Sequence, residues 1–305
     1  MSWRSVVISR PARLRRDHFS LAIEQEQRIT VPFEDIAIIV LNHREITLTH
    51  PVLSACGEYG IGLYATSDTH HPSGVFLPYL QHSRATRMLR QQLDLPRPLV
   101  KQLWAALVRR KIANQAVCLA LAGREGAAQL EGYARQVRSG DSEMMESTAA
   151  AFHFNRLFGI GFKRSQPTWT NAALDYGYAI LRGAIARGLV AHGFFPSLGL
   201  FHASEQNAFN LADDLIEPFR PLVDLHVASR LSKELPDEPR DLLPADKVEL
   251  VGLLNVDLAM PRGTMSALAA IEQAVESLAR CYEHGSDRLL ELPTLIGLEQ
   301  HRLEC

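Results

Sequence analysis

The sequence lacks the features that mark a membrane protein, a disulfide-stabilised protein or a zinc-stabilised domain. Its longest apolar runs, Ile36–Leu41 and Ala116–Ala122, are far shorter than the roughly 20 residues of a membrane-spanning helix. The residues after Met1–Arg4 do not form the apolar core of a signal peptide. The cysteines are scattered, without C-x-x-C or zinc-ligand spacing: Cys56, Cys118, Cys281 and Cys305. We therefore expect a soluble, cytoplasmic protein that does not bind membranes.

Several common catalytic motifs are also missing. The chain has no Walker A loop, no G-x-S-x-G elbow, no H-E-x-x-H pair and no dinucleotide-binding glycine fingerprint after a predicted strand. No repeat of fixed period is present, nor any low-complexity tract. A function must therefore be argued from individual polar side chains and their surroundings.

What the sequence does contain is ample apolar material and an uneven distribution of charge. Hydrophobic residues fill 47% of 305 positions, and 34 acidic residues nearly balance 32 basic ones. Between Arg84 and Arg138, however, 11 basic residues stand against 3 acidic ones, a local charge of +8. Between Glu205 and Glu249, 11 acidic residues stand against 5 basic ones, or −6. The asymmetry favours a phosphate-rich partner and a cation site, although solvated helix surfaces carry similar charge.

The hydrophobic pattern divides the chain near Gln81. Before that point, short β-branched runs separated by polar turns are typical of a compact antiparallel β unit. The predicted elements are strands at 5–9, 19–24, 29–31, 36–41, 46–48 and 61–64, a helix at 51–60 and a loop at 67–74. After Gln81, apolar residues recur three and four apart, as helices require. We predict an α+β protein with a β domain over 1–82 and a larger, all-helical domain over 83–305.

The first segment that could carry chemistry is Gly140–Gly159. Asp141 or Ser142 can cap a helix whose first turns hold Glu143 and Glu146. Acidic residues at that place also simply complement the helix dipole. The small apolar residues that follow indicate a buried helix, so a glutamate beside them must be solvated, paired or bound to a metal.

Two further segments add a histidine and a second pair of acids. His202 follows an apolar stretch and precedes a polar turn, where a hydrogen-bonded structural histidine is the commoner case. Asp214 and Glu217 are three residues apart and would be neighbours on a helix. Pro218 disfavours helical geometry at Glu217 and places it at a kink or helix end. The alternative is an acidic solvated face offset by Arg220.

Together these segments supply two glutamates and one imidazole, with an auxiliary aspartate: Glu146, His202, Glu217 and Asp214. Carboxylate oxygens with one imidazole suit Mn²⁺ or Mg²⁺ better than zinc. Such an ion can polarise a phosphodiester and activate water or a 3′-hydroxyl as the nucleophile. The residues therefore favour metal-assisted phosphoryl transfer on a nucleic acid.

The same segments, in this order, resemble the CRISPR-associated integrase family, the larger of two subunits that insert spacers into CRISPR arrays. The resemblance covers essentially the whole chain and looks closest to the type II branch. Its most specific parts are Ala172–Leu181 (AALDYGYAIL), Pro196–His202 (PSLGLFH) and Phe209–Asp224 (FNLADDLIEPFRPLVD), with further similarity in Gly140–Gly159, Val31–Ile36 and Gly60–Asp68. One departure is Asp175, where the family has Asn in its N-Y-G-Y motif.

The resemblance implies that Glu146, His202 and Glu217 are the metal ligands and catalytic residues. Asp214 matches an acid that some branches also use, and Glu143 does not align with the first ligand. It further implies an N-terminal β-sandwich through which the protein forms a homodimer, and a small companion subunit. The substrate would be double-stranded DNA, joined by attack of its 3′-hydroxyl on the leader–repeat phosphodiester without a covalent protein intermediate.

Three alternatives remain open at this point. The chain could be a nuclease that cuts DNA without joining it, since water can replace the 3′-hydroxyl at such a site. It could be a DNA-binding scaffold whose acids only cap helices. It could also hydrolyse a small phosphorylated metabolite, but that function would leave the basic segment unexplained.

Overall fold

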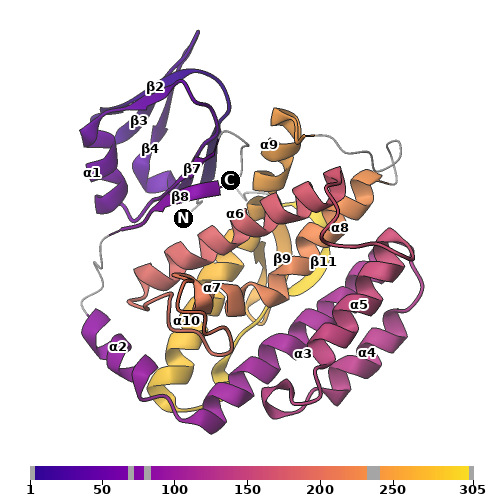
Figure 1. The fold of residues 1–305 in the computed structure, drawn as a ribbon. Helices are drawn as coiled ribbons and strands as arrows, with labels where there is room; N and C mark the ends of the chain where they lie inside the picture. The colour runs from indigo at the N-terminus through magenta and orange to yellow at the C-terminus, as the bar shows by residue number, and fades with distance from the viewer. Residues whose placement is uncertain (1–3, 68–71, 79–83, 232–240, 302–305) are drawn as a thin grey trace.

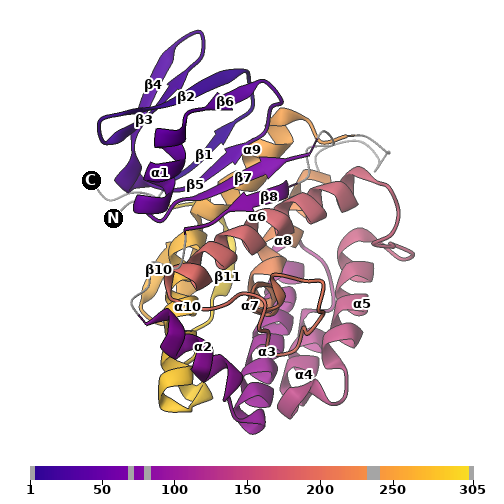
Figure 2. The ribbon, with the colours of Figure 1, turned by 60° about the vertical axis from the view of Figure 1, so that its left-hand side comes forward.

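The computed structural model describes residues 4–67, 72–78, 84–231 and 241–301. A smaller, strand-rich part sits on a larger, mostly helical part (Figures 1 and 2). The predicted mixed α+β class is therefore confirmed. The predicted boundary between residues 82 and 83 lies outside the described residues and stays a prediction. No helix within these ranges is long and apolar enough to span a bilayer.

The strand-rich part contains two four-stranded sheets. The first, in the order β4-β3-β2-β6, consists of β2 (Ala12–Asp17), β3 (Ser20–Glu24), β4 (Arg28–Pro32) and β6 (Ile46–Leu48). The second, in the order β1-β5-β7-β8, consists of β1 (Arg4–Ile8), β5 (Ile36–Leu41), β7 (Gly62–Thr66) and β8 (Pro72–Phe76). A 3₁₀ turn, η1 (Phe33–Asp35), precedes β5, and helix α1 (His50–Glu58) precedes β7. The predicted helix is confirmed, but β8 begins inside the predicted loop 67–74, of which residues 68–71 are not described.

The strand directions correct the prediction of an antiparallel unit. The pairs β1–β5, β5–β7 and β2–β6 are parallel. Residues 36–40 of β5 are all buried, and an unbroken apolar run of this kind is typical of a parallel strand covered on both faces. Both sheets and α1 contribute to one core, as the buried side chains of Leu14, Ile39 and Val52 show. The implied sandwich packing stays a prediction.

The helical part is organised around two long helices. Its helices are α2 (Ala85–Leu93), α3 (Arg97–Leu121), α4 (Ala127–Gln136), α5 (Met145–Phe158), α6 (Trp169–Ala191), α7 (Asn210–Leu215), α8 (Arg220–Leu231), α9 (Pro244–Gly252) and α10 (Ala267–His284). Short 3₁₀ turns are η2 (Ser139–Asp141), η3 (Glu217–Phe219), η4 (Leu253–Asn255) and η5 (Asp287–Leu289). Most residues of α6 are buried, as expected for a helix covered on all sides.

The prediction that this part is entirely helical is wrong. Strands β9 (Val256–Met260), β10 (Gly263–Ser266) and β11 (Thr294–Gln300) form an antiparallel sheet in the order β10-β9-β11. Strand β9 alternates between buried and half-buried residues, as a strand with one covered face does. Five such residues between helical segments are a weak signal, and Pro261 and Arg262 form the turn of the β9–β10 hairpin.

A buried asparagine on α3 connects this sheet to the helical part through hydrogen bonds. Nδ2 of Asn114 in α3 donates to the carbonyl oxygens of Pro218 (2.7 Å) and Pro293 (3.0 Å), and its Oδ1 accepts the N–H of Leu295 (3.1 Å). A buried amide with these partners holds its neighbours in one arrangement. Because Pro218 follows Glu217, these bonds fix η3 against α3.

The two parts of the molecule meet along α6, which lies beneath β7 and β8 (Figure 2). The ring of Tyr64 rests on Gly183, where an added Cβ would come within 2.2 Å of it. Nε of Arg187 donates to the carbonyl oxygen of Gly60 (2.8 Å), and its guanidinium pairs with Glu272 of α10. With the Tyr64 ring in this position, the junction has no room for any side chain at position 183.

Candidate active site

Glu146 lies in the first turn of α5. The backbone N–H groups of Met145 and Glu146 donate to the two carboxylate oxygens of Asp141, at 2.9 and 3.0 Å. Asp141 therefore satisfies N–H groups of the first turn as expected, but Met144 is the N-cap residue, and the prediction that Glu143 lies in the first turns of this helix is wrong. Glu143 instead pairs with Arg138 at the surface, at 3.0 Å, and takes no part in the site.

Glu217 begins η3, the short break between α7 and α8. The kink predicted from Pro218 is confirmed, and the Glu217 side chain is buried there. Its Oε1 lies 2.9 Å from Nε of Arg220. The Arg220 guanidinium in turn lies over the ring of Tyr178, 4.7 Å from its centroid, and the Tyr178 hydroxyl donates to Asp224. Glu217 is thus supported by a cation that is itself held on an aromatic ring.

Lys111 of α3 lies between the two glutamates. Its Nζ donates to Oε1 of Glu146 (2.7 Å) and pairs with Oε2 of Glu217. Burial by itself lowers the pKa of Lys111, but the carboxylates of Glu217 and Glu146 outweigh it and leave that pKa raised. Burial by itself raises the pKa of Glu217, but Lys111 and Arg220 outweigh it and leave that pKa lowered. Both groups are therefore charged.

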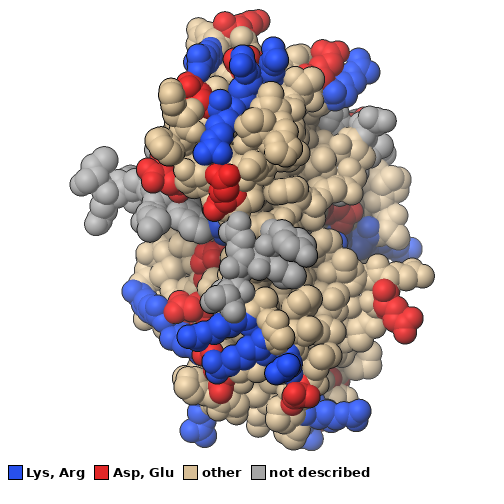
Figure 3. All heavy atoms as spheres, turned by 90° about the vertical axis from the view of Figure 1, so that its left-hand side faces the viewer, with Lys and Arg blue, Asp and Glu red and all other residues tan. Residues whose placement is uncertain are grey.

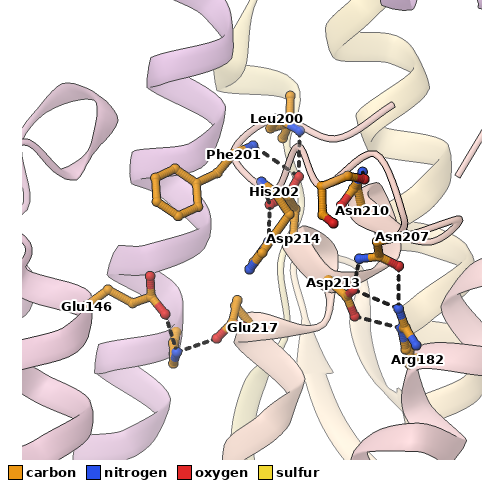
Figure 4. A network of polar contacts seen from close by, with 12 residues as sticks. Glu146, Arg182, Leu200, Phe201, His202, Asn207, Asn210, Asp213, Asp214 and Glu217 are labelled. Carbon is orange, nitrogen blue, oxygen red and sulfur yellow. Dashed lines mark hydrogen bonds and ion pairs between the residues drawn. The ribbon is translucent and has the colours of Figure 1, made fainter. Parts of the chain in front are cut away.

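Asp214 of α7 holds the loop that carries His202. Its buried carboxylate accepts the backbone N–H groups of Leu200, Phe201 (3.2 Å) and His202 (3.1 Å). Its Oδ1 also lies 2.8 Å from Nδ1 of His202, and this hydrogen bond is the main cause of a raised His202 pKa. When Nδ1 donates to the carboxylate, Nε2 is left to face a ligand. Figure 4 shows these bonds converging on Asp214.

The same loop is closed by two further features. A Cβ at Gly199 would lie 2.2 Å from the carbonyl oxygen of His202, so only glycine fits there. Nδ2 of Asn210 donates to the carbonyl oxygens of Ser197 (3.0 Å) and Ser204 (2.9 Å), on either side of the loop. His202 is therefore presented from a fixed backbone.

The structure brings Glu146 and Glu217 together around one ammonium group and sets His202 nearby (Figure 4). The side chains of His202 and Glu146 are 38% and 25% exposed, so the site opens to solvent from their side. The charges of His202 and Glu217 act on each other's pKa. Among the residues that the structure describes, no three His, Cys, Asp or Glu are grouped as metal ligands. The predicted ligand set stays a prediction.

Sequence reasoning missed Lys111 and did not place Arg220 in the site. A signal for Lys111 existed, because it lies on a largely apolar face of α3 beside Val108 and Ile112, both fully buried. A lysine on such a face must be paired. The sequence indicates only that Arg220 could offset the charge of an acidic surface, whereas in the structure Arg220 contacts Glu217 directly.

Most basic residues of the segment 84–138 are exposed, and two of them are not. Lys111 points into the site, and Arg110 donates to the side chain of Thr294 in β11 (2.7 Å). Among the exposed basic residues are Arg87 and Arg90 on α2 and Arg84 directly before it. Figure 3 looks onto this side of the molecule and shows a group of Lys and Arg in its lower half and another in its upper half, with acids among both.

Comparison with known proteins identifies the family. The sequence profile described as CRISPR associated protein Cas1 matches residues 6–240. The chain is 42% identical over 311 residues to a CRISPR-associated endonuclease Cas1 of Neisseria meningitidis, with 100% of both chains covered. The chain belongs to the Cas1 family of CRISPR-associated proteins, and the resemblance stated from the sequence is confirmed.

Solved structures share the fold. A casposase bound to integration product matches with a TM-score of 0.72 at 18% identity, over 94% of this chain and 92% of the other. A Cas6-RT-Cas1–Cas2 complex matches with a TM-score of 0.71 at 16% identity, over 95% of this chain and 36% of the other. At these identities the likeness establishes the fold alone.

Asp175, the departure from the family motif, has a partner in this chain. Its carboxylate pairs with the guanidinium of Arg164 and is 56% exposed. The added negative charge is therefore offset locally.

Proposed function

We propose that this protein is a divalent-metal-dependent DNA integrase that inserts short foreign fragments into a CRISPR array, with endonuclease activity at the same site. The observation that carries the proposal is the pair of carboxylates, Glu146 and Glu217, held around one positive charge beside His202. Membership in the Cas1 family supports it. The Neisseria relative is named an endonuclease, and the casposase structure contains an integration product.

The residues of the site fit Mg²⁺ or Mn²⁺ as the bound ion. Two carboxylates and one imidazole are donors that these ions accept. Glu146 and Glu217 already stabilise a cation between them, so an ion held by Glu146, His202 and Glu217 would compete with Lys111 for the same oxygens. Asp214 fits better as the residue that orients His202, because its oxygens accept backbone N–H groups.

Bound there, the ion would neutralise charge on the attacked phosphate and help to align the 3′-hydroxyl. The residues of the chain prepare this arrangement. Asp214 keeps Nδ1 of His202 engaged and leaves Nε2 for the ligand position, while Arg220 offsets the charge of buried Glu217. Direct displacement of the target 3′-oxygen needs no Ser, Tyr or Cys nucleophile.

The partners follow from the same proposal. The substrates are two double-stranded DNAs, the incoming fragment and the leader–repeat target. The exposed arginines of α2 suit phosphate contacts, which would make DNA binding strongly salt-dependent. A small companion subunit is supported by the Cas1–Cas2 complex with the same fold. We further expect a homodimer formed through the strand-rich part, and a cytoplasmic location.

A strand-transfer assay tests the proposal. End-labelled duplex DNA, a supercoiled CRISPR plasmid, the companion subunit and the protein are combined with Mn²⁺ or with a chelator. We expect label to join the plasmid only with Mn²⁺. Glu146→Gln and Glu217→Gln should lower joining by about 10³-fold or more, because each removes a charged ligand of the ion.

Glu143→Gln is the matched control, since Glu143 lies on the same segment but pairs with Arg138 at the surface. It should join DNA at the wild-type rate. Full strand transfer by folded Glu146→Gln and Glu217→Gln protein would contradict the proposed site. Cutting without joining would reduce the function to a nuclease, and binding without either reaction would favour a scaffold.

A further inference from the structure

Phe201 is an exposed aromatic residue next to the histidine of the site. Its relative exposure is 56%, although large aromatic side chains are usually buried. It directly precedes His202, and the two rings meet edge to face with centroids 5.6 Å apart. Figure 4 shows the ring projecting from the loop on the side where Glu146 lies. A substrate that reaches the exposed side of the site therefore passes this ring.

The Phe201 ring is held in a fixed orientation. One face lies parallel on the buried indole of Trp104, with ring centroids 4.4 Å apart and an interplanar angle of 1°. The backbone N–H of Phe201 donates to Asp214, at 3.2 Å. The Trp104 ring also meets the imidazole of His202 edge-on, with ring centroids 6.0 Å apart. One face of the phenyl ring is thus packed, and the exposure belongs to the rest of the ring.

The surroundings favour a nucleobase over an apolar protein segment on this ring. A protein partner would need a broader apolar patch, whereas the ring projects toward the side of the site where Glu146 lies, and the carboxylate of Glu146 is hydrogen-bonded to Lys111. A nucleotide combines a flat π face with a phosphate, and bases stack on aromatic side chains in single-strand binding sites. The centroids of the Phe201 and His202 rings are 5.6 Å apart, which is less than two steps of about 3.4 Å between successive nucleotides of a strand. A base stacked on Phe201 would therefore lie within one or two nucleotides of the group at His202.

We infer that Phe201, backed by Trp104, is a stacking site for an unpaired base within one or two nucleotides of the reacting strand end. The inference rests on the proposed function, because it takes DNA to be the substrate. Phe201 positions the strand and does not touch the reacting atoms. It fixes the base so that the attached phosphate or 3′-hydroxyl stays at His202 and Glu146.

Fluorescence of 2-aminopurine tests this stacking without a chemical step. Duplexes with a short 3′ overhang carry the probe at one of the last three nucleotides and are bound in the presence of chelator. Fluorescence anisotropy of a dye at the distal end reports duplex binding in the same sample. We expect quenching of at least one probe position in the wild-type protein, and its loss in Phe201→Leu, which keeps apolar cover on Trp104.

The affinity for the overhang should fall roughly 5- to 150-fold in Phe201→Ala, as for other stacked bases, and recover in Phe201→Tyr. In strand-transfer assays with Mn²⁺, Phe201→Ala should raise KM for the overhang DNA more than it lowers kcat. Phe19→Leu is the matched control, because Phe19 is 73% exposed in the strand-rich part, away from the site. It should leave quenching unchanged.

The outcomes separate this inference from the proposed function. Duplex binding with equal quenching in wild type and Phe201→Leu, or with no quenching at any position, overturns the stacking site and leaves the integrase proposal intact. Absence of duplex binding in the wild-type protein overturns both. Quenching lost in Phe201→Leu and restored in Phe201→Tyr supports the stacking site.

Discussion

The two halves of the candidate site are held by different means. Glu146 and Glu217 come from helix starts and are balanced by cations, with Lys111 between them and Arg220 behind Glu217. His202 comes from a loop, which is held by hydrogen bonds to the carboxylate of Asp214 and to the side-chain amide of Asn210. The first half is fixed by charge, and the second half is fixed by backbone hydrogen bonding.

This difference predicts how each half responds to substitution. Removing a charge from the first half leaves another buried charge without its partner, which is costly. Removing the carboxylate from the second half leaves backbone N–H groups unpaired and loosens the loop. Four substitutions test this contrast, in order of decreasing expected change in free energy.

Glu217→Ala should have the largest effect on the stability of the metal-free protein. Glu217 is 3% exposed and neutralises both Lys111 and Arg220, so its loss leaves buried positive charge. We expect the free energy of unfolding to fall by about 3–5 kcal/mol, the usual cost of breaking a buried ion pair. Urea denaturation in the presence of chelator measures this change.

The double variant Glu217→Ala/Lys111→Met provides the check. If the cost comes from unpaired charge, removing both partners should destabilise the protein less than the sum of the two single changes. Strict additivity would show that the ion pair does not hold this half together.

Asp214→Asn should have the next largest effect. The isosteric amide cannot accept all the N–H groups that Asp214 accepts from Leu200, Phe201 and His202, and its NH₂ group opposes one of these donors. We expect a loss of about 2–3 kcal/mol in the free energy of unfolding. Hydrogen exchange of the amides at 200–202 should also accelerate.

Asp213→Asn is the matched control for the loop. Asp213 is the neighbouring residue, but it pairs with Arg182 and Asn207 and makes no contact with the amides of 200–202. Its substitution should leave exchange at these amides unchanged. Equal acceleration in both variants would mean that general loosening, and not the Asp214 carboxylate, controls the loop.

The sequence predicted local backbone features of the candidate site better than it predicted the contacts between its segments. The acceptance of first-turn N–H groups by Asp141 and the kink at Glu217 follow from local rules for helix starts and for proline, and both are present in the structure. The ammonium of Lys111 between two glutamates depends on three segments that meet only in the folded chain. Rules that use only neighbouring residues in the sequence cannot predict a contact between three distant segments.

The fold shows the same limit. The helical periodicity of α3 and α6 was visible over many residues, whereas the five residues of β9 were too few to stand out. The parallel pairing of β5 is set by partners distant in sequence, so its apolar run indicated a buried strand without giving its direction.

Lys111→Met should change the affinity for the metal ion more than it changes the stability of the metal-bound protein. Lys111 and a divalent ion compete for Glu146 and Glu217, so removing the ammonium should raise Mn²⁺ affinity about tenfold or more. Titration calorimetry or Mn²⁺ electron paramagnetic resonance measures the affinity without a reaction.

Lys247→Met is the matched control, since Lys247 is also a buried lysine but lies on α9. It should leave Mn²⁺ affinity unchanged. Weaker Mn²⁺ binding in Lys111→Met would mean that Lys111 supports the metal-bound site and does not compete with the ion.

His202→Gln should change the stability of the metal-free protein least, by no more than about 0.5 kcal/mol. The imidazole is 38% exposed, and the glutamine amide can still donate to Asp214. Saturating Mn²⁺ should raise the Tm of the wild-type protein, because a ligand that binds only the folded state stabilises it, and should raise the Tm of His202→Gln much less. Thermal denaturation with Mn²⁺ and with chelator gives both values. If Mn²⁺ raises the Tm of His202→Gln as much as that of the wild-type protein, His202 is not a ligand of the ion, and Glu146 and Glu217 bind it without the imidazole.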